Sequence, residues 1–412
     1  MREGWEVKTL GEVADVKGGK RLPKGYKLEA EPTAHPYITV SDFTDDGTVS
    51  TRKLKYISDE VFEQIQRYTI SSDDLYLSIA GTIGKTGVVP AELSGANLTE
   101  NACKLVLRPG VDQRFLYYFT VSNEFVEQAG MNTRTTAQPK LALERLKTIS
   151  LFLPPLAEQK RIVAVLDVAF EGIELALAAA SKNLKNAREL FETTLNTTFT
   201  QKGKGWVETT LGEVTRFSGG GTPSKSNRAF WDGSIPWVSP KDMKFEVIVK
   251  SIDKITHEAI EKSATKLIPE GATLIVVRSG ILARTVPIAI VGRELTVNQD
   301  LKAICPNETI LPKFLTYLMR ANERNLLAKV TRGATVHRLS TYTLKSLPIY
   351  VPSLEVQSQI SKKCENLSTQ TQHLAALYQQ KIDALGELKQ SLLQKAFAGE
   401  LTAQAQPLEA TA

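Results

Sequence analysis

Hydrophobic residues follow two different periods along this chain. In the first third, the short runs HPYITV, DLYLSIA and CKLVL are rich in β-branched and aromatic residues and are bounded by Gly and Pro, a pattern that predicts strands. The stretches DEVFEQIQRY and RFLYYFTVSNEFVEQA repeat apolar residues every three to four positions, which predicts amphipathic helices. This part of the chain therefore predicts a compact α+β domain.

A much longer helical pattern follows a Pro-Pro step. Pro155 suits the first helical turn, where its missing N–H is not needed. From there to Phe199 no proline occurs, and apolar residues keep the three-and-four spacing of a heptad seam. The seam consists of Val163, Leu166, Phe170, Ile173, Leu177, Ala180, Leu184, Ala187 and Phe191. It predicts a coiled-coil helix over 154–200, whose length at ~1.5 Å per residue is roughly 65 Å.

The whole pattern is written twice. GWEVKTLGEV at the start returns as GWVETTLGEV from Gly205, with seven of ten positions identical. A Gly-rich turn (Gly18, Gly19 and Gly219 to Gly221) follows in both halves. PYITVSDF then matches PWVSPKDM, LYLSIAGTIGK matches LIVVRSGILAR, FLYYF matches FLTYL, and LPPLAEQKRI matches VPSLEVQSQI. These collinear matches predict an internal repeat.

The repeat predicts two domains and two long helices in alternation. The expected parts are a globular domain at 1–153, a helix at 154–200, a second globular domain at 201–351, a second helix at 352–400 and a flexible tail at 401–412. The second seam is more polar and skips register near Ile382. It consists of Ile360, Cys364, Leu367, Thr371, Leu374, Tyr378, Ile382, Leu385 and Leu392.

A long helix with one apolar stripe needs a partner, and the matching helix of the other repeat is the expected one. A coiled coil between two copies of the chain is the alternative. The predicted fold is thus α+β, with two similar globular α/β domains, two long helices that pair as an antiparallel coiled coil, and an internal pseudo-twofold repeat.

Composition and charge narrow the class of protein. The chain has 412 residues, 42% of them hydrophobic, and a net charge of +6. Residues 1–204 carry 26 basic and 26 acidic side chains, whereas the remainder carries 25 basic and 19 acidic ones. This mild basicity permits nucleic-acid binding. The three cysteines are far apart, and no apolar run approaches the ~18 residues of a membrane span, so we expect a soluble cytoplasmic protein.

Motifs for catalysis are missing from the sequence. The segment GKT from Gly84 resembles the end of a phosphate loop. That motif also requires a glycine five residues before Gly84, but the residue there is Ile79. The four histidines have no metal-ligand spacing, and no Asn/Asp-Pro-Pro-aromatic run of amino-methyltransferases occurs. We therefore expect a binding and scaffolding protein without catalytic residues, metal or cofactor; a stand-alone enzyme is the weakest alternative.

Two globules carried on long helices suit a target with two separated sites. A helix of about 65 Å is close to two turns of duplex DNA at ~34 Å per turn, which suggests a split DNA site. Basic and polar side chains in matching loops are the candidate contacts, because they can bind phosphates or base edges. In the first half these candidates are Lys20, Arg21, Lys24, Ser41, Asp42, Lys85, Arg134, Gln138 and Lys140. In the second half they are Lys225, Arg228, Lys241, Asp242, Arg278, Arg284, Arg332, His337 and Arg338.

These motifs, in this duplicated order, resemble the specificity (S) subunit of type I restriction-modification systems over essentially the whole chain. The resemblance rests on GW-x-x-x-TLGEV at the start of each half, the Gly turn before a Pro-aromatic strand, and P-x-L-x-x-Q-x-x-I at the start of each long helix. The last motif supplies the candidate partner-docking residues Pro154, Leu156, Gln159, Ile162, Pro352, Leu354, Gln357 and Ile360. The second half departs from the first at Ser353 and Val356, where the first has Pro155 and Glu158.

The resemblance implies a function in DNA recognition. Each globule would be a target recognition domain that reads one part of an asymmetric bipartite site in double-stranded DNA, and the helices would set the spacer. Two modification subunits, which use S-adenosylmethionine to methylate adenine, would dock on the helices, and restriction subunits would use ATP and Mg. The alternatives are the DNA-reading subunit of another defence or methylation system, and a coiled-coil scaffold without sequence readout.

Overall fold

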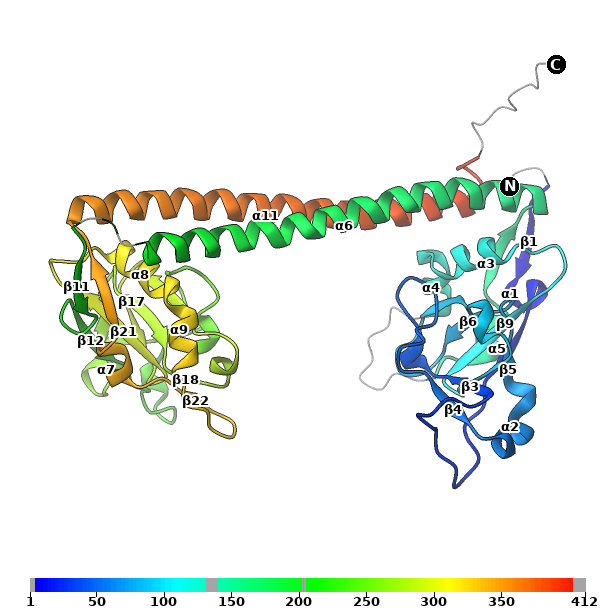
Figure 1. The fold of residues 1–412 in the computed structure, drawn as a ribbon, viewed down its shortest axis with the longest axis horizontal. Coiled ribbons are helices and arrows are strands. Elements are labelled where there is room, and N and C mark those ends of the chain that lie inside the picture. Colours follow the sequence, from blue (N-terminus) through cyan, green and yellow to red (C-terminus); the bar gives the residue numbers. More distant parts are fainter. Residues whose placement is uncertain (1–3, 131–139, 202, 204, 403–412) are drawn as a thin grey trace, which may run out of the picture. The chain divides into compact units, whose positions relative to one another are not determined.

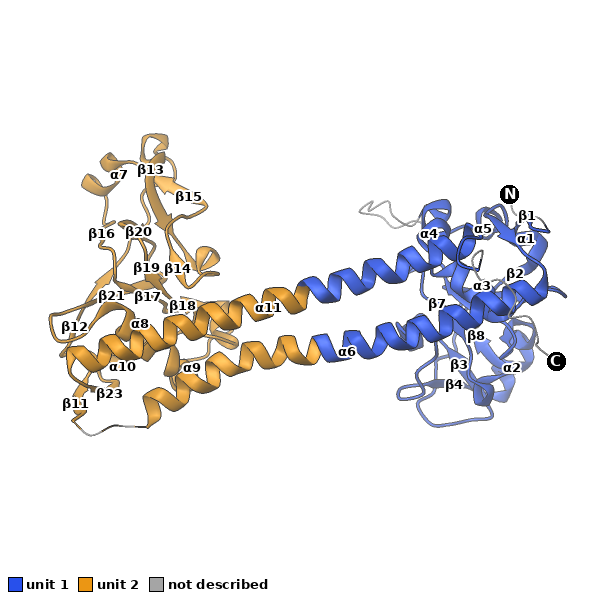
Figure 2. Cartoon of the chain, turned by 90° about the horizontal axis from the view of Figure 1, so that it is seen from above, with its two compact units in different colours: residues 1–180, 380–412 blue, residues 181–379 orange. Residues whose placement is uncertain are grey.

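The chain divides into two compact units (Figure 2). The structure, a computed structural model, describes residues 4–130, 140–201, 203 and 205–402. Unit 1 comprises residues 1–180 and 380–412, and unit 2 comprises residues 181–379. Each unit therefore combines one globular half of the chain with a part of both long helices. None of the helices in the described ranges combines the length and the apolar character that a bilayer crossing requires.

The globular part of unit 1 contains two four-stranded sheets. The first has the order β2 (Ala14–Gly18), β9 (Ala102–Leu107), β6 (Leu75–Ser78), β7 (Thr86–Val88), and all its pairs are antiparallel. The second has the order β4 (Lys55–Ile57), β3 (His35–Ile38), β8 (Ala96–Leu98), β5 (Thr69–Ile70), with β3 and β8 parallel. The strands predicted from HPYITV, DLYLSIA and CKLVL are β3, β6 and β9.

Short helices surround these sheets (Figure 1). They are α1 (Leu10–Val13), α2 (Asp59–Ile65), α3 (Gln113–Thr120), α4 (Asn123–Ala129) and α5 (Leu143–Lys147). The helical pattern predicted from RFLYYFTVSNEFVEQA is two helices, because the Ser122 hydroxyl accepts a hydrogen bond from the Phe125 N–H and starts a new one. A ribbon of β1 (Glu6–Thr9) and β10 (Ser150–Leu153) leads into the first long helix.

Unit 2 repeats this topology. Its first sheet has the order β12 (Thr215–Gly219), β21 (Leu301–Pro306), β17 (Thr273–Val276), β19 (Ile288–Val291), with β14 (Val247–Ile248) added at the edge. Its second has the order β15 (Asp253–Ile255), β13 (Trp231–Val238), β20 (Leu295–Val297), β16 (Leu267–Ile268), with β13 and β20 parallel. The same strand order and the equivalent parallel pairs β3–β8 and β13–β20 confirm the internal repeat, while the added strand β14 is parallel to β19.

The remaining elements of unit 2 include two ribbons and four short helices. One ribbon, β11 (Val207–Thr210) with β23 (Pro348–Val351), corresponds to β1 and β10. The other joins β18 (Arg278–Ser279) to β22 (His337–Arg338). The helices are α7 (His257–Glu261), α8 (Pro312–Ala321), α9 (Glu323–Ala328) and α10 (Thr341–Lys345).

The two long helices, α6 (Leu156–Thr200) and α11 (Leu354–Phe397), each start in one unit and end in the other. In unit 1 the first part of α6 packs with the last part of α11, through Phe170, Leu393 and other core residues. In unit 2 the last part of α6, with Phe191, shares a core with Cys364 near the start of α11. The helices are therefore antiparallel, as predicted.

The structure corrects one position of the second seam. Leu374 is 39% exposed, whereas Ala375 is half-buried between Thr371 and Tyr378. From Thr371, a step of four residues leads to Ala375 and a further step of three leads to Tyr378, so the heptad spacing is kept through Ala375.

Each long helix is also fastened to the globular core at its end. Phe397, the last residue of α11, lies in unit 1 with its ring centre 5.3 Å from that of Phe115 and 5.4 Å from that of Phe119. Phe199, near the end of α6, lies in unit 2 with its ring centre 5.2 Å from that of Phe314. In each unit, part of the globule therefore shares a hydrophobic core with the long helices.

Candidate nucleic-acid interface

A buried glutamine joins each long helix to the globule beside it. In unit 1 the side chain of Gln159 is fully buried; its Oε1 accepts the Asp112 N–H at 2.7 Å, and its Nε2 donates to the Gly110 and Pro154 carbonyls at 2.9 and 2.8 Å. Both carbonyls and the N–H belong to loops of the same unit. The glutamine of the P-x-L-x-x-Q-x-x-I motif therefore holds the helix in place.

The same arrangement is present in unit 2. Gln357 accepts the Leu311 N–H at 2.8 Å and donates to the Thr309 and Pro352 carbonyls, both at 2.9 Å. The motif was expected to contact a partner, but most of its side chains face inward: Pro154, Gln159, Ile162, Pro352 and Gln357 are buried, and Ile360 is half-buried. Leu156 and Leu354, which are 41% and 47% exposed, are left for a direct contact.

Two aspartates among the candidate base contacts are also buried. Asp42 is 6% exposed and accepts hydrogen bonds from the Thr39 N–H at 2.8 Å and the Thr39 hydroxyl at 2.7 Å. Asp242 is 7% exposed and accepts the Ser239 N–H at 2.9 Å and the Ile252 N–H at 2.9 Å. Both carboxylates complete a capping box at a short 3₁₀ turn, so Oδ2 of Asp42 and both oxygens of Asp242 are occupied within their own unit.

Two of the basic candidates of unit 1 contact Glu100, and a third, Lys20, lies beside Tyr68. Arg21 Nε donates to Glu100 Oε1 at 2.7 Å, and Lys140 Nζ donates to the Glu100 carbonyl at 2.7 Å. Lys20 precedes Arg21, and its ammonium lies 5.5 Å from the ring centre of Tyr68. Arg21 and Lys140 are exposed, so their remaining N–H donors are open to a ligand.

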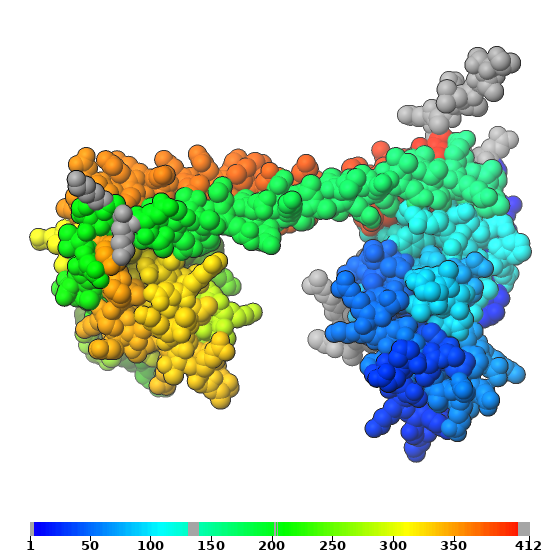
Figure 3. Space-filling model, viewed as in Figure 1, coloured from blue at the N-terminus to red at the C-terminus, as the bar shows by residue number. Residues whose placement is uncertain are grey.

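The other candidates of unit 1 have varied surroundings. Lys85 is fixed by the Phe43 carbonyl and by Asp45 Oδ1, both at 2.9 Å. Ser41 and Lys24 are exposed, and the Ser41 hydroxyl shares a hydrogen bond with that of Thr39. Arg134 and Gln138 lie outside the described residues. In the space-filling view, the segment between β2 and β4, drawn in darker blue, forms the end of unit 1 farthest from α6 (Figure 3).

In unit 2 the ribbon β18–β22 brings basic candidates together. Arg278 and Arg338 are directly opposite each other, and His337 is the neighbour of Arg338. Arg278 Nε donates to Asp300 Oδ1 at 2.5 Å, while Arg338 is exposed. Arg332 is exposed in the turn that precedes β22. The ribbon lies on the side of unit 2 opposite α6 and α11 (Figure 1).

The ribbon and Lys140 occupy matching places in the two units. The Leu339 N–H donates to the Val277 carbonyl at 2.9 Å, and the Leu141 N–H donates to the Ile79 carbonyl at 2.8 Å. Arg338 and Lys140 each precede these leucines. A basic residue therefore lies next to the ends of the equivalent strands β6 and β17 in both copies.

The remaining candidates of unit 2 lie elsewhere on its surface. Lys225 and Arg228 are exposed in the segment before β13, and Arg284 is exposed after β18. Lys241 is bound to Asp253 Oδ2 at 2.7 Å, and this hydrogen bond raises the pKa of the Lys241 ammonium. The structure thus does not draw these four residues into one cluster.

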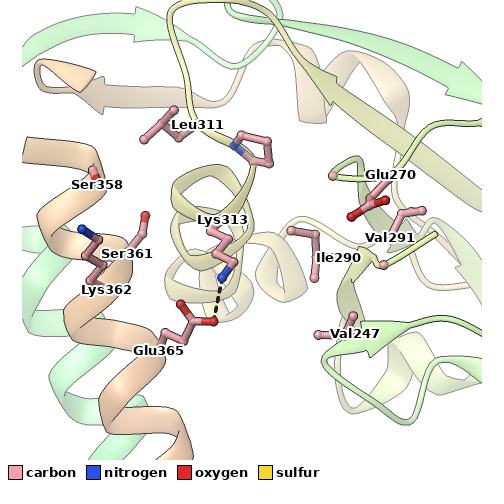
Figure 4. Close-up of a pocket in the computed structure, with 13 residues that line it drawn as sticks. Val247, Glu270, Ile290, Val291, Leu311, Lys313, Ser358, Ser361, Lys362 and Glu365 are labelled. Atoms are coloured by element: carbon pink, nitrogen blue, oxygen red, sulfur yellow. Dashed lines mark hydrogen bonds and ion pairs between the residues drawn. The ribbon is translucent and has the colours of Figure 1, made fainter. Parts of the chain in front are cut away.

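Unit 2 also has a groove of about 860 Å³ between α8, α11 and β19 (Figure 4). Ile290, Val291 and Leu311 give it an apolar lining, and Glu270 stands on one side. Lys313 of α8 points to Glu365 of α11, and their charged groups are 2.6 Å apart. In unit 1 the corresponding pair is Arg114 with Asp167, so an ion pair ties the globule to the long helix in both copies.

Within the described residues, no three His, Cys, Asp or Glu side chains are arranged to hold a metal ion. Exposed Lys and Arg side chains, among them Arg21, Lys140 and Arg338, are present on the globules. Such groups bind phosphates and base edges.

Comparison with known proteins identifies a family model and several relatives that this chain matches. The family model described as "Type I restriction modification DNA specificity domain" matches it twice, over residues 2–183 and 203–383. The specificity subunit of the Escherichia coli type I restriction enzyme EcoR124I/EcoR124II is 38% identical over 219 residues, which are 52% of this chain and 53% of the relative. The specificity subunit of the enzyme MjaIX from Methanocaldococcus jannaschii is 30% identical over 38% of this chain and 37% of the relative. These matches span about half or less of the curated relatives.

Solved structures share the fold over almost the whole chain. A chain from a study of complex assembly and conformational transition of the type I R-M system superposes with a TM-score of 0.81 and 21% identity, covering 97% of this chain and 99% of that one. The HsdS subunit from Thermoanaerobacter tengcongensis gives a TM-score of 0.60 with 21% identity, covering 97% and 98%.

Proposed function

Because this chain belongs to the family of type I restriction-modification DNA specificity domains, we propose that it is the DNA-binding specificity subunit of a type I restriction-modification complex. The observation that carries this proposal is the duplication of one globular fold with different polar side chains in each copy. A protein that must recognise two different half-sites needs this combination of equal scaffold and unequal surface.

Each globule reads one half of an asymmetric bipartite site. Support comes from the basic side chains that precede two equivalent leucines, Lys140 before Leu141 in unit 1 and Arg338 before Leu339 in unit 2, in surroundings that differ. Arg338 lies on the ribbon β18–β22, whereas Lys140 binds the Glu100 carbonyl. Arg and Lys reach guanine edges and phosphates, so unequal surroundings favour unequal base sequences.

The long helices set the spacer and dock two modification subunits. Their outer surface carries large apolar side chains that the chain itself does not cover; on α6 in unit 1 these include Val165, Val168 and Leu175, which are 41%, 74% and 68% exposed. Their spacing of three and seven residues places them on one face of the helix. Leu377 on α11 is 46% exposed in unit 2. Exposed apolar stripes of this kind favour protein partners.

This chain supplies recognition and not catalysis. Modification subunits with S-adenosylmethionine would methylate adenine, and restriction subunits with ATP and Mg would cleave DNA. The buried glutamines and aspartates of the chain hold its own backbone, which supports a structural use of side chains that an enzyme would keep accessible.

The experiment that tests the function is a map of methylated adenines. DNA is sequenced by a single-molecule method from cells that express this chain with a type I modification subunit, and from cells that lack only this chain. We expect one bipartite motif that is methylated only when the chain is present. Methylation that does not depend on the chain would contradict the proposal and favour a scaffold without sequence readout.

A further inference from the structure

A second basic site lies in unit 1 where β2 ends. It is a pocket of about 300 Å³, lined by Lys17, Arg67 and Lys104 together with the aromatic ring of Tyr68. None of these four residues was a candidate from the sequence. The pocket is formed at the junction of the two sheets, by β2 and β9 of one and by β5 and β8 of the other.

The pocket concentrates positive charge. Lys17 and Lys104 are directly opposite each other on the antiparallel strands β2 and β9. Like charges in this position repel each other. Asp74 accepts a hydrogen bond from Lys104 Nζ at 3.1 Å, and Asp15 lies 3.6 Å from Lys17 Nζ. Arg67, which is exposed, is the third positive charge of the pocket. The carboxylates of Asp74 and Asp15 can neutralise only two of these three charges.

The backbone around the pocket is closely packed. Any side chain at Gly19 would place its Cβ 2.0 Å from the Thr99 carbonyl oxygen, so the chain can pass β8 only with glycine here. The Gly19 N–H then donates to the Ala102 carbonyl at 2.9 Å, and the Lys20 N–H donates to the Leu98 carbonyl at 2.8 Å. The basic side chains therefore stand on a fixed frame.

Unit 2 lacks this charge although it has the same strands. Ser218 and Ala303 form the pair on β12 and β21 that corresponds to the two lysines. Arg67 lies two residues before Thr69 of β5, and Thr265 lies two residues before Leu267 of the equivalent strand β16, so Thr265 takes the place of Arg67. Thr265 is only 3% exposed, and its hydroxyl donates a hydrogen bond to the Gly221 carbonyl. The fold does not require the basic pocket, because the other copy forms without it.

We propose that the pocket of Lys17, Arg67 and Lys104 binds a phosphate group, supplied by the DNA backbone beside the half-site that unit 1 reads. The proposal rests on the proposed DNA-binding function. Ammonium and guanidinium donors bind phosphate oxygens by charge-assisted hydrogen bonds, and such contacts fix the register of a protein on the duplex. A phosphate between the two lysines also relieves their repulsion.

The test compares the protein, in complex with its modification subunits, with the variants Lys17→Ser and Arg67→Thr, which introduce the residues of unit 2. Lys104 is left unchanged because the buried Asp74 depends on it. Affinity for duplex DNA is measured over a range of salt concentrations. We expect each variant to lower the slope of log K against log salt by about one. Affinity at about 0.1 M salt should fall roughly tenfold, on specific and nonspecific duplexes alike.

Two controls accompany these variants. Lys53→Ser removes the same charge from an exposed turn before β4 of unit 1 and should leave the slope unchanged. Lys17→Arg keeps the charge and should retain wild-type affinity. Thermal melting of each variant confirms that it is folded before its affinity is interpreted.

The outcomes separate the two proposals. A wild-type complex that binds no duplex contradicts the proposed function itself. A wild-type complex that binds DNA while both variants keep its affinity and slope overturns the pocket alone. A loss confined to the specific duplex assigns the side chains to bases instead of phosphate. Calorimetric binding of inorganic phosphate that the variants lose, with DNA affinity unchanged, assigns the pocket to a free phosphate and overturns the DNA source.

Discussion

At the scale of single residues, the buried Gln159 predicts a large effect on stability. Gln159→Leu leaves the buried Pro154 carbonyl without its partner and also removes the partners of the part-buried Asp112 N–H and Gly110 carbonyl. Each buried polar group left unpaired costs about 1–3 kcal/mol. We expect a clearly lower melting temperature by circular dichroism, whereas Lys160→Leu, at the exposed neighbouring position, should change it little. Equal melting temperatures would contradict the role of Gln159.

The three cysteines predict a second residue-scale effect. Burial raises the pKa of Cys103 to about 12 and that of Cys364 to about 11, and it also raises the pKa of the half-buried Cys305. Because the thiolate is the reactive form, iodoacetamide at pH 8 should alkylate Cys305 first in the folded protein. Peptide mass spectrometry measures the order, and a urea-unfolded sample should show equal rates.

The same shifts give a pH dependence of stability. Above the ordinary thiol pKa of 9.0, the unfolded chain loses the protons of Cys103 and Cys364, while the folded chain keeps them. The stabilisation is therefore complete below pH 9 and decreases as the pH rises toward 11. Replacing Cys364 by Ser should reduce this part of the alkaline decrease in melting temperature.

Residue roles were the least predictable part of the site. Asp42 and Asp242 occur in loops at matching places, which is also where base contacts are expected. The sequence does not reveal that their oxygens cap the turns that begin at Thr39 and Ser239. The signal that could have found this was the spacing of Thr or Ser three residues before Asp, which is that of a capping box.

At the scale of elements, the helix seam makes a graded prediction. Phe170 is 5% exposed, and its ring centre lies 5.2 Å from that of Tyr118. Phe170→Ala should lower the free energy of unfolding by about 3–5 kcal/mol, as such core truncations do. Leu374→Ala should cost far less, because Leu374 is 39% exposed. Urea unfolding followed by fluorescence compares the two variants, and similar losses would contradict the corrected seam.

Element types followed from the sequence more completely than element boundaries or partners. Period and order were enough for β3, β6, β9 and both long helices, because their hydrophobic positions are strongly periodic. The break between α3 and α4 depends on one hydroxyl at Ser122, which a periodic pattern does not show. The pocket around Lys17 and Arg67 could not be predicted either, since its residues are far apart in the chain and meet only through sheet pairing.

At the scale of the whole molecule, the duplication gives the two units the same scaffold but different surfaces. The two sheets recur in the same strand order, while the ribbon β18–β22 is described only in unit 2 and the basic pocket carries its charge only in unit 1. A chain built in this way can change the surface of one half without disturbing the other. This division supports the proposed recognition of two unequal half-sites.

The length of the helices should then determine the length of the spacer. One heptad inserted into both α6 after Ala180 and α11 after Gln379, at the boundary of the units, preserves the seam because seven residues complete one repeat. It adds about 10 Å of helix, or roughly three base pairs of DNA. The methylated motif should keep both half-sites and gain about that spacer, when adenine methylation is mapped by sequencing. A heptad in α6 alone should abolish methylation because the paired helices no longer match. An unchanged spacer in the double insertion would refute the proposal that the helices set the spacer length.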